Sequence, residues 1–367
     1  MRHSGNQRAT RAAASILSLL APLSLRAAEP VAAVGVAAER TTTVHDFRFA
    51  SGESLAELKV HYRVLGAPHR AAEGQIDNAV LLLHSTASSG AQFLTANFAG
   101  ELFGAGQPLD AARFFIIMPD AIGHGGSSKP SDGLRGAFPH YDYADMVEAQ
   151  WRVLAEQGVR RLRLVLGTSM GCMLTFVWAE KHPQGVQAAM PIACLPTQTA
   201  GQNRVWRTAA VEAIRADPAW SGGNYTSPPA QGLHAAAGLM AVSGGIGPLA
   251  MARDYPTSAA ADAFWHDRLK RALTETDAND LLYQLDASRN YDAEPALASL
   301  PMPVTWVNIG DDFINLPGSP IVAAAAARMP RGRFYLVPVS NETRGHSTHS
   351  IARFWKDELV ALLARSQ

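Results

Sequence analysis

The stretch VLGTSMGCML, residues 165–174, places Ser169 between two glycines at the point where an apolar run ends. Residues 162–166, LRLVL, are typical of a buried strand, and residues 172–182, CMLTFVWAEKH, are typical of a helix. A sharp turn from strand to helix leaves no room for side chains on either side of its central residue, so glycines are required there. The pattern therefore predicts a serine exposed at a strand end, as a nucleophile would be. The alternative is an ordinary glycine turn with a serine helix cap.

Two later segments contain the partners that a nucleophilic serine requires. A serine hydroxyl attacks well only when a neighbouring base removes its proton and an acid orients that base. Residues 305–317, TWVNIGDDFINLP, end a strand-like run in two carboxylates, and residues 339–350, VSNETRGHSTHS, carry two histidines after the last strand-like run. The order serine, acid, histidine is the one expected for this motif. We predict that Asp312 is the acid and His346 the base.

Some neighbouring residues compete for these roles. Asp311 remains a rival acid. His346 follows Gly345, whose freedom lets the imidazole turn back toward the serine, whereas His349 is expected to be a surface or helix-cap residue. His84 lies just before the loop discussed next, and we expect it to be structural.

An acyl-transfer site also needs backbone donors for the negative charge that develops on the substrate oxygen. One donor should be the N–H of Met170, which directly follows the serine at a helix N-terminus. The other should come from the loop after the apolar run 78–84, NAVLLLH, and Thr86 is our first choice. These two N–H groups form the predicted oxyanion hole.

From about residue 45 the chain alternates short apolar runs with amphipathic segments, which is typical of an α/β fold with a mostly parallel sheet flanked by helices. The expected strands are 58–66 (antiparallel) and, as central strands, 78–86, 113–120, 162–167, 188–194, 303–310 and 333–340; the clearest helices are 141–158, capped by Gly158, and 351–366. Strand-like runs vanish between 196 and 296. We therefore predict a core formed by 41–195 and 297–367, with a helical cap inserted at 196–296.

The first 38 residues read as a leader that does not belong to the fold. Residues 1–11 are basic, and residues 12–25, AAASILSLLAPLSL, form an apolar run too short to cross a bilayer. Small residues follow, so we expect a secretory signal peptide cleaved between Ala27 and Ala38, and a periplasmic or secreted protein. The alternative is a disordered or start-site extension.

Composition limits the classes of partner. Of the 367 residues, 47% are hydrophobic, and the 32 basic and 32 acidic side chains cancel, which gives no electrostatic reason to expect a nucleic acid or a membrane surface as partner. Cys172 and Cys194 are the only cysteines. Buried free thiols are the default expectation, and a disulfide between them is left open. No cofactor or metal is expected, because no His, Cys and Asp cluster has ligand spacing.

Together with their surroundings, these residues resemble the homoserine O-acetyltransferase family of α/β-hydrolase-fold proteins, from about residue 45 to residue 366. The similar segments are FRFASGESLAELKVHYRVLG (47–66), DNAVLLLHSTASS (77–89), FPHYDYADMVEAQWRVL (138–154), AIRADPAWSGGNY (213–225) and DANDLLYQLDASRNYD (277–292). In the third, Tyr143 or a neighbour replaces the family's threonine. The resemblance implies an α/β-hydrolase fold, the positions Ser169, Asp312 and His346 as the catalytic ones, and a homodimer through the caps.

The chain also departs from the family at positions that matter for its substrate. In GLHAAAG (232–238), Ala237 stands where the family carries an arginine expected to hold the substrate carboxylate. Gly244 falls nearest the place of a family tyrosine, and Ser347 replaces the acidic neighbour of the histidine. Loss of a partly buried arginine–carboxylate contact weakens binding by roughly 10²-fold.

These observations favour a secreted or periplasmic serine hydrolase that cleaves a small-molecule carboxylic ester, with water as the acyl acceptor; amides and lactones are less favoured substrates. Two alternatives remain. One is an O-acyltransferase of the homoserine O-acetyltransferase type, and the other is a non-catalytic binding protein on the same fold.

Overall fold

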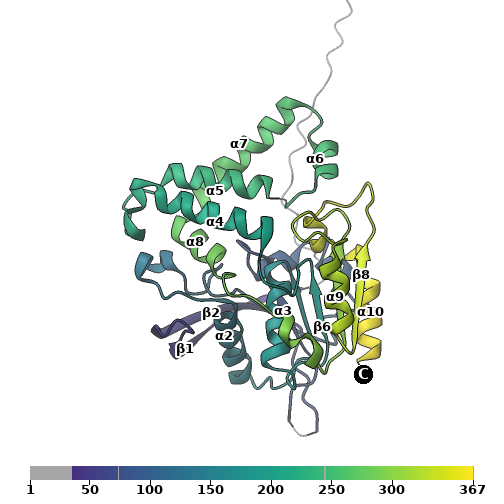
Figure 1. Ribbon diagram of the computed structural model, residues 1–367. Coiled ribbons are helices and arrows are strands. Elements are labelled where there is room, and N and C mark those ends of the chain that lie inside the picture. The colour runs from purple at the N-terminus through teal and green to yellow at the C-terminus, as the bar shows by residue number, and fades with distance from the viewer. Residues whose placement is uncertain (1–34, 73, 244, 367) are drawn as a thin grey trace, which may run out of the picture.

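The computed structural model describes residues 35–72, 74–243 and 245–366 (Figure 1). The predicted leader lies outside these residues up to residue 34. The first strand begins at Ala38, which is earlier than the predicted start of the core at residue 41. Within the described ranges, no helix combines the length and the apolar character that crossing a membrane requires.

An eight-stranded sheet forms the centre of the core, in the order β1-β2-β4-β3-β5-β6-β7-β8. Its strands are β1 (Ala38–Arg48), β2 (Ser54–Leu65), β3 (Ala79–Leu83), β4 (Phe115–Pro119), β5 (Leu164–Thr168), β6 (Ala189–Ile192), β7 (Val304–Ile309) and β8 (Gly332–Val337). β2 runs antiparallel to β1 and β4, and all later neighbours are parallel, as predicted. The expectation that residues 333–340 form a central strand is wrong, because β8 lies at the sheet edge with most of its residues partly exposed.

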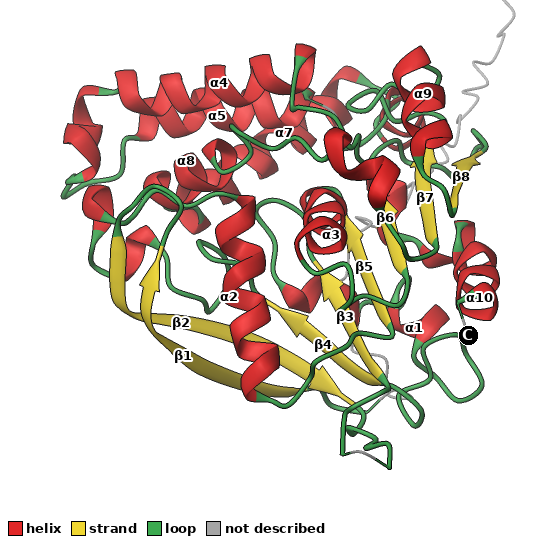
Figure 2. Ribbon diagram, turned by 60° about the horizontal axis from the view of Figure 1, so that its bottom comes forward, coloured by secondary structure: helices red, strands yellow, loops and turns green. Residues whose placement is uncertain are grey.

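Helices cover both faces of the sheet (Figure 2). One face packs against α2 (Tyr143–Glu156), α3 (Met170–Lys181) and α9 (Pro320–Arg328), and the other against α1 (Ala99–Leu102) and α10 (Lys356–Arg365). Strands β3 to β7 are therefore buried on both sides, which explains their continuous apolar runs.

One predicted helix ends as expected, and the other is interrupted near its start. Gly158 follows α2 in the left-handed conformation, with φ of +79°, as a helix C-cap glycine does. The predicted helix 351–366 is broken: Ala352–Phe354 form a 3-10 turn, and α10 begins only at Lys356. Between them, Trp355 has a non-helical backbone, with φ of −140° and ψ of 0°, and its buried indole N–H donates to the carbonyl oxygen of His349 at 3.2 Å.

The α-helices that the structure describes between β6 and β7 lie together over one end of the sheet (Figures 1 and 2). They are α4 (Gly201–Ala216), α5 (Ala230–Val242), α6 (Pro248–Asp254), α7 (Ser258–Glu275) and α8 (Ala278–Asp286). Gln284 of α8 donates to the Gly123 carbonyl at 2.7 Å, and the Ser347 N–H donates to the Gly245 carbonyl at 2.8 Å. These helices therefore cover loops that follow β4 and β8.

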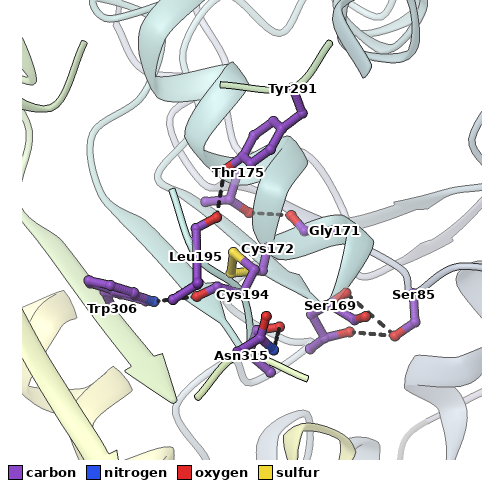
Figure 3. The surroundings of a disulfide bond; sticks show 12 residues. Ser85, Ser169, Gly171, Cys172, Thr175, Cys194, Leu195, Tyr291, Trp306 and Asn315 are labelled. Atoms are coloured by element: carbon purple, nitrogen blue, oxygen red, sulfur yellow. Dashed lines mark hydrogen bonds between the residues drawn. A yellow bond between two sulfur atoms is a disulfide. The ribbon is translucent and has the colours of Figure 1, made fainter. Parts of the chain in front are cut away.

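Cys172 and Cys194 form a disulfide, with their Cα atoms 5.8 Å apart (Figure 3). The default expectation of two free thiols is therefore wrong. Cys172 lies in the first turn of α3 and Cys194 lies just after β6. The two segments become neighbours only because α3 packs beside β6, which sequence spacing does not reveal.

Candidate active site

Ser169 occupies the turn between β5 and α3 in a backbone conformation that is rare for a residue other than glycine, with φ of +56° and ψ of −112°. Its N–H donates to the carbonyl oxygen of Ile192 in β6 at 2.9 Å. Such a conformation costs on the order of 1–3 kcal/mol and persists only where the surroundings enforce it. The neighbouring strand and the helix behind it supply that enforcement.

The two glycines of the motif are required by close backbone packing, as the sequence predicted. A Cβ atom on Gly167 would lie 2.0 Å from the Gly171 carbonyl oxygen. A Cβ atom on Gly171 would lie 1.9 Å from the carbonyl oxygen of Leu83 in β3. The turn can therefore form only when both side chains are absent.

The structure brings together the three side chains that were selected from the sequence. His346 Nε2 lies 2.8 Å from Ser169 Oγ, and His346 Nδ1 lies 2.7 Å from Asp312 Oδ2. Asp312 and His346 are buried, at 1% and 7% exposure. With its Nδ1–H donated to the carboxylate, the neutral imidazole presents a lone pair at Nε2 to the serine hydroxyl.

The carboxyl group of Asp312 is held as an anion. Burial by itself raises the pKa of Asp312, but the charge and hydrogen bond of His346 and the N–H donors of Asn315 and Ile314 outweigh it, and the pKa lies below its usual value. The Ile314 N–H donates to Oδ1 at 2.9 Å, and Asn315 Nδ2 donates to Oδ2 at 2.8 Å. Sequence reasoning missed Asn315, because two of its three partners, Ala193 and His346, come from distant parts of the chain.

The rival acid, Asp311, has a different position. Its Oδ2 accepts hydrogen bonds from Thr343 Oγ1 and from the Gly345 N–H, both at 3.0 Å. Gly345 has φ of +60°, and a Cβ there would lie 2.5 Å from Gly247 of the cap. Asp311 thus shapes the loop that carries His346, and Gly345 is needed for the close approach of cap and core.

His349 is not the surface or helix-cap residue that the sequence suggested. It is 8% exposed, its ring centre lies 5.1 Å from that of His346, and its Nε2 lies 3.4 Å from Ser85 Oγ. The 3-10 turn Ser347–Ser350 follows His346, and residues three apart in such a turn lie on the same side. Burial and the nearby charge of His346 lower the pKa of His349 to about 3, so His349 is neutral near neutral pH.

The loop after β3 is predicted to form half of the oxyanion hole. It is hydrogen-bonded to Thr168, the residue before the serine. Ser85 Oγ lies 3.2 Å from Thr168 Oγ1, and Gln92 Nε2 donates to the same oxygen at 2.8 Å. Within the described chain, neither the Thr86 N–H nor the Met170 N–H donates a hydrogen bond. Both are thus available to an incoming oxygen atom. The supporting side chains, Gln92 and Thr168, were not anticipated.

His84 has the structural position that the sequence suggested. It is 1% exposed, its Nε2 accepts the Ala121 N–H at 2.9 Å, and its Nδ1 donates to the Ser85 carbonyl at 2.8 Å. Its ring packs against His124 at 5.0 Å between centres. Burial lowers the pKa of both rings, that of His124 to about 3. His84 thereby links the start of the Thr86 loop to the end of β4.

A cavity of about 240 Å³ lies between this loop and the cap. It is lined by Ala87, Ala237, Met240, Arg268, Arg271, Ala272, Glu275, Thr276 and Leu281. Ala237, which replaces the arginine of the resembling family, is therefore part of the wall. Gly244, the second departure, lies outside the described residues.

We expect Gly171→Ala to destabilise the protein by at least about 2 kcal/mol, because the new Cβ meets the Leu83 backbone and neither strand nor helix can yield. Gly238→Ala in α5 is the matched control, since its Cβ would meet only Trp265 at 3.6 Å. Urea denaturation measures both variants. Equal stability of the two would contradict the proposed packing of the turn.

The buried histidines predict a loss of stability in mild acid. The pKa of His124 is about 3 in the native state, whereas an unfolded histidine ionises near pH 6.5, so only the unfolded state takes up the proton between these values. Stability is therefore full above about pH 6.5 and falls below it, by roughly 1 kcal/mol per pH unit for this residue. We expect His124→Phe to reduce this slope in denaturation series between about pH 6.5 and about pH 4.5. His45→Phe, at an exposed residue of β1, is the control for the loss of an imidazole.

Comparison with known proteins agrees with this geometry. The family model described as the alpha/beta hydrolase fold matches residues 78–338. A homoserine O-acetyltransferase of Trichormus variabilis is 37% identical over 212 residues, 54% of this chain and 55% of that relative, so the chain spans about half the relative's length. Another, from Nostoc punctiforme, is 31% identical over 306 residues, 74% of this chain and 82% of the relative.

Among solved structures, an acetylester hydrolase from Corynebacterium glutamicum superimposes with a TM-score of 0.77 at 22% identity, covering 89% of this chain and 96% of that one, which shows a shared fold. The sequence match and the site geometry lead to one conclusion. The chain belongs to the α/β-hydrolase fold family and, within it, to a branch that resembles the homoserine O-acetyltransferases.

Proposed function

We propose that this protein forms an acyl-enzyme on Ser169 and transfers the acyl group of a small ester or thioester to an oxygen nucleophile. The observation that carries the proposal is the unbroken hydrogen-bond chain from Asp312 through His346 to Ser169, at 2.7 Å and 2.8 Å. A binding protein would have no need for a buried carboxylate, an imidazole and a strained serine in this arrangement.

The geometry supports a two-step reaction. His346 Nε2 takes the proton of Ser169 Oγ as the oxygen attacks the acyl carbonyl carbon, and Asp312 holds the imidazole in the required tautomer. The N–H groups of Met170 and Thr86 stabilise the negative oxygen of the tetrahedral intermediate. His346 then delivers its proton to the leaving oxygen or sulfur. In the second step it deprotonates the acceptor, which attacks the acyl-enzyme, and it returns that proton to Ser169 Oγ as the ester bond to the serine breaks.

The relatives favour an alcohol as the acceptor. The two relatives described above that match in sequence, from Trichormus variabilis and Nostoc punctiforme, are named homoserine O-acetyltransferases. On this support, O-acyl transfer to a small alcohol is the first candidate for the second step, ahead of the hydrolysis favoured by the sequence.

Hydrolysis is the second candidate, because one observation favours it. Ala237 lines the cavity beside the Thr86 loop at the place where the resemblance leads one to expect a carboxylate-binding arginine. An acceptor bearing a carboxylate loses that contact, and water then competes for the acyl-enzyme.

Two experiments test the proposal: labelling of Ser169 by a probe and identification of the product that the acyl group forms. A fluorophosphonate probe should label Ser169, and Ser169→Ala should lose both the label and at least about 10³-fold of p-nitrophenyl acetate turnover. Ser299→Ala, at an exposed serine of the core, is the control and should retain both. Absence of labelling in the wild type refutes acyl-enzyme formation.

The products then identify the acceptor. If addition of homoserine or another small alcohol accelerates turnover and yields its acetyl ester, transfer is the second step. If acetate is the product at an unchanged rate, the acceptor is water.

We further propose that residues 1–38 direct export to the periplasm or the exterior. The basic, apolar and small-residue order of this segment supports the proposal, and so does the Cys172–Cys194 disulfide, which is typical of oxidising compartments. Residues 1–40 fused to a phosphatase that is active only outside the cytoplasm should give phosphatase activity in bacterial cells. The same fusion without residues 12–25 should give none, and equal activity of both fusions would refute export by this segment.

A further inference from the structure

Asn315 lies at the back of the Asp312–His346 pair, in a position that neither the sequence pattern nor the two-step reaction assigns. It is 2% exposed. Its Nδ2 donates to Asp312 Oδ2 at 2.8 Å and to the Ala193 carbonyl oxygen at 3.1 Å. An amide nitrogen carries two hydrogens, so one is given to the carboxylate and the other to the backbone. The His346 Nδ1 atom, 3.3 Å away, already donates to Asp312.

The backbone that receives this second hydrogen bond is irregular and firmly held. Ala193 follows β6 with φ of +66°, and its N–H donates to the carbonyl of Val307 in β7 at 2.8 Å. The carbonyl oxygen of the next residue, Cys194, accepts the indole N–H of Trp306 at 3.0 Å (Figure 3). The Ala193 carbonyl can therefore serve as a fixed acceptor for Asn315.

The disulfide joins this anchor to the nucleophile. Cys194 is covalently bonded to Cys172, which lies three residues after Ser169 in the first turn of α3 (Figure 3). These covalent and hydrogen bonds form a closed ring of connected residues. It runs from Ser169 through α3 and the disulfide to Ala193, then by hydrogen bonds to Asn315, Asp312 and His346 and back to Ser169.

We propose that Asn315 is a positioning residue that holds the Asp312 carboxylate in the plane of the His346 ring, and that the Cys172–Cys194 disulfide fixes the anchor on which Asn315 acts. The inference rests on the proposed function of Ser169. Asn315 makes no hydrogen bond to Ser169, so its contribution passes through Asp312 and His346. A misplacement of about 1 Å in such a group costs roughly 10²-fold in rate.

Asn315→Leu tests the first part, because leucine keeps the branched four-atom side-chain skeleton of asparagine and removes the donor. We expect kcat for p-nitrophenyl acetate to fall by about 10- to 100-fold, with KM changed less than about threefold. The acidic limb of the kcat/KM profile should move to higher pH, because a carboxylate that has lost a donor stabilises the protonated imidazole more strongly. A role in folding alone would leave this limb in place.

Asn308→Ala is the matched control, since Asn308 is a buried asparagine of β7 whose amide makes no hydrogen bond within the described chain. It should leave the pH profile unchanged. Asn315→Ala provides a second variant if the leucine does not fit, and thermal melts establish that each protein is folded. An Asn315→Leu enzyme with kcat within twofold of the wild type and an unmoved acidic limb overturns the assignment.

A double-mutant cycle tests the second part. The pair Cys172→Ala and Cys194→Ala removes the disulfide, and we expect it to lower kcat and the rate of fluorophosphonate labelling by about 3- to 10-fold. Added to Asn315→Leu, the loss of the disulfide should lower kcat and the labelling rate little further, because both changes break the same ring of connected residues. Losses that multiply show that the disulfide acts independently of Asn315 and overturn this part.

The outcome also separates the two proposals. A wild-type protein that the probe does not label refutes the proposed function. A labelled wild type with an unaffected Asn315→Leu variant refutes the positioning role alone.

Discussion

The close approach of three backbone segments at residues 167–171 is the constraint on which the rest of the site depends. β5, the start of α3 and the end of β3 come so near to each other that Cβ atoms on Gly167 and Gly171 would meet carbonyl oxygens at about 2 Å. Ser169 is thereby held at positive φ with its hydroxyl pointing out of the turn toward His346. The energy stored in that conformation comes from the packing of a fully buried helix and sheet.

Neighbouring residues of the same chemical type have separate tasks around this serine. Asp312 accepts the imidazole N–H, whereas Asp311 binds Thr343 and Gly345 and shapes the histidine loop. His346 faces the serine, whereas His349 stays buried and neutral behind it. A single positive charge can therefore develop at His346 during the reaction without a second cation beside it, which favours its use as a base.

The cap lies against the loop that contains Thr86. Its helices form one wall of the cavity beside the Thr86 loop, and Ala237 makes that wall smaller and less polar than an arginine would. The catalytic groups come entirely from loops of the core. The Ser169–His346–Asp312 chain and the cavity wall that contains Ala237 thus belong to different parts of the molecule.

The amino-acid sequence alone was enough to predict the alternation of strands and helices, the serine turn and the order of serine, acid and histidine, because these depend on local periodicity and on the space that glycine provides. It also identified Asp312 and His346, but could not exclude Asp311 or place His349, since adjacent residues on a loop differ only in direction. The disulfide, the edge position of β8 and the hydrogen bonds of Asn315 are evident only in the folded structure. Each of these depends on segments more than twenty residues apart that meet only when the sheet assembles, and no local pattern encodes such contacts.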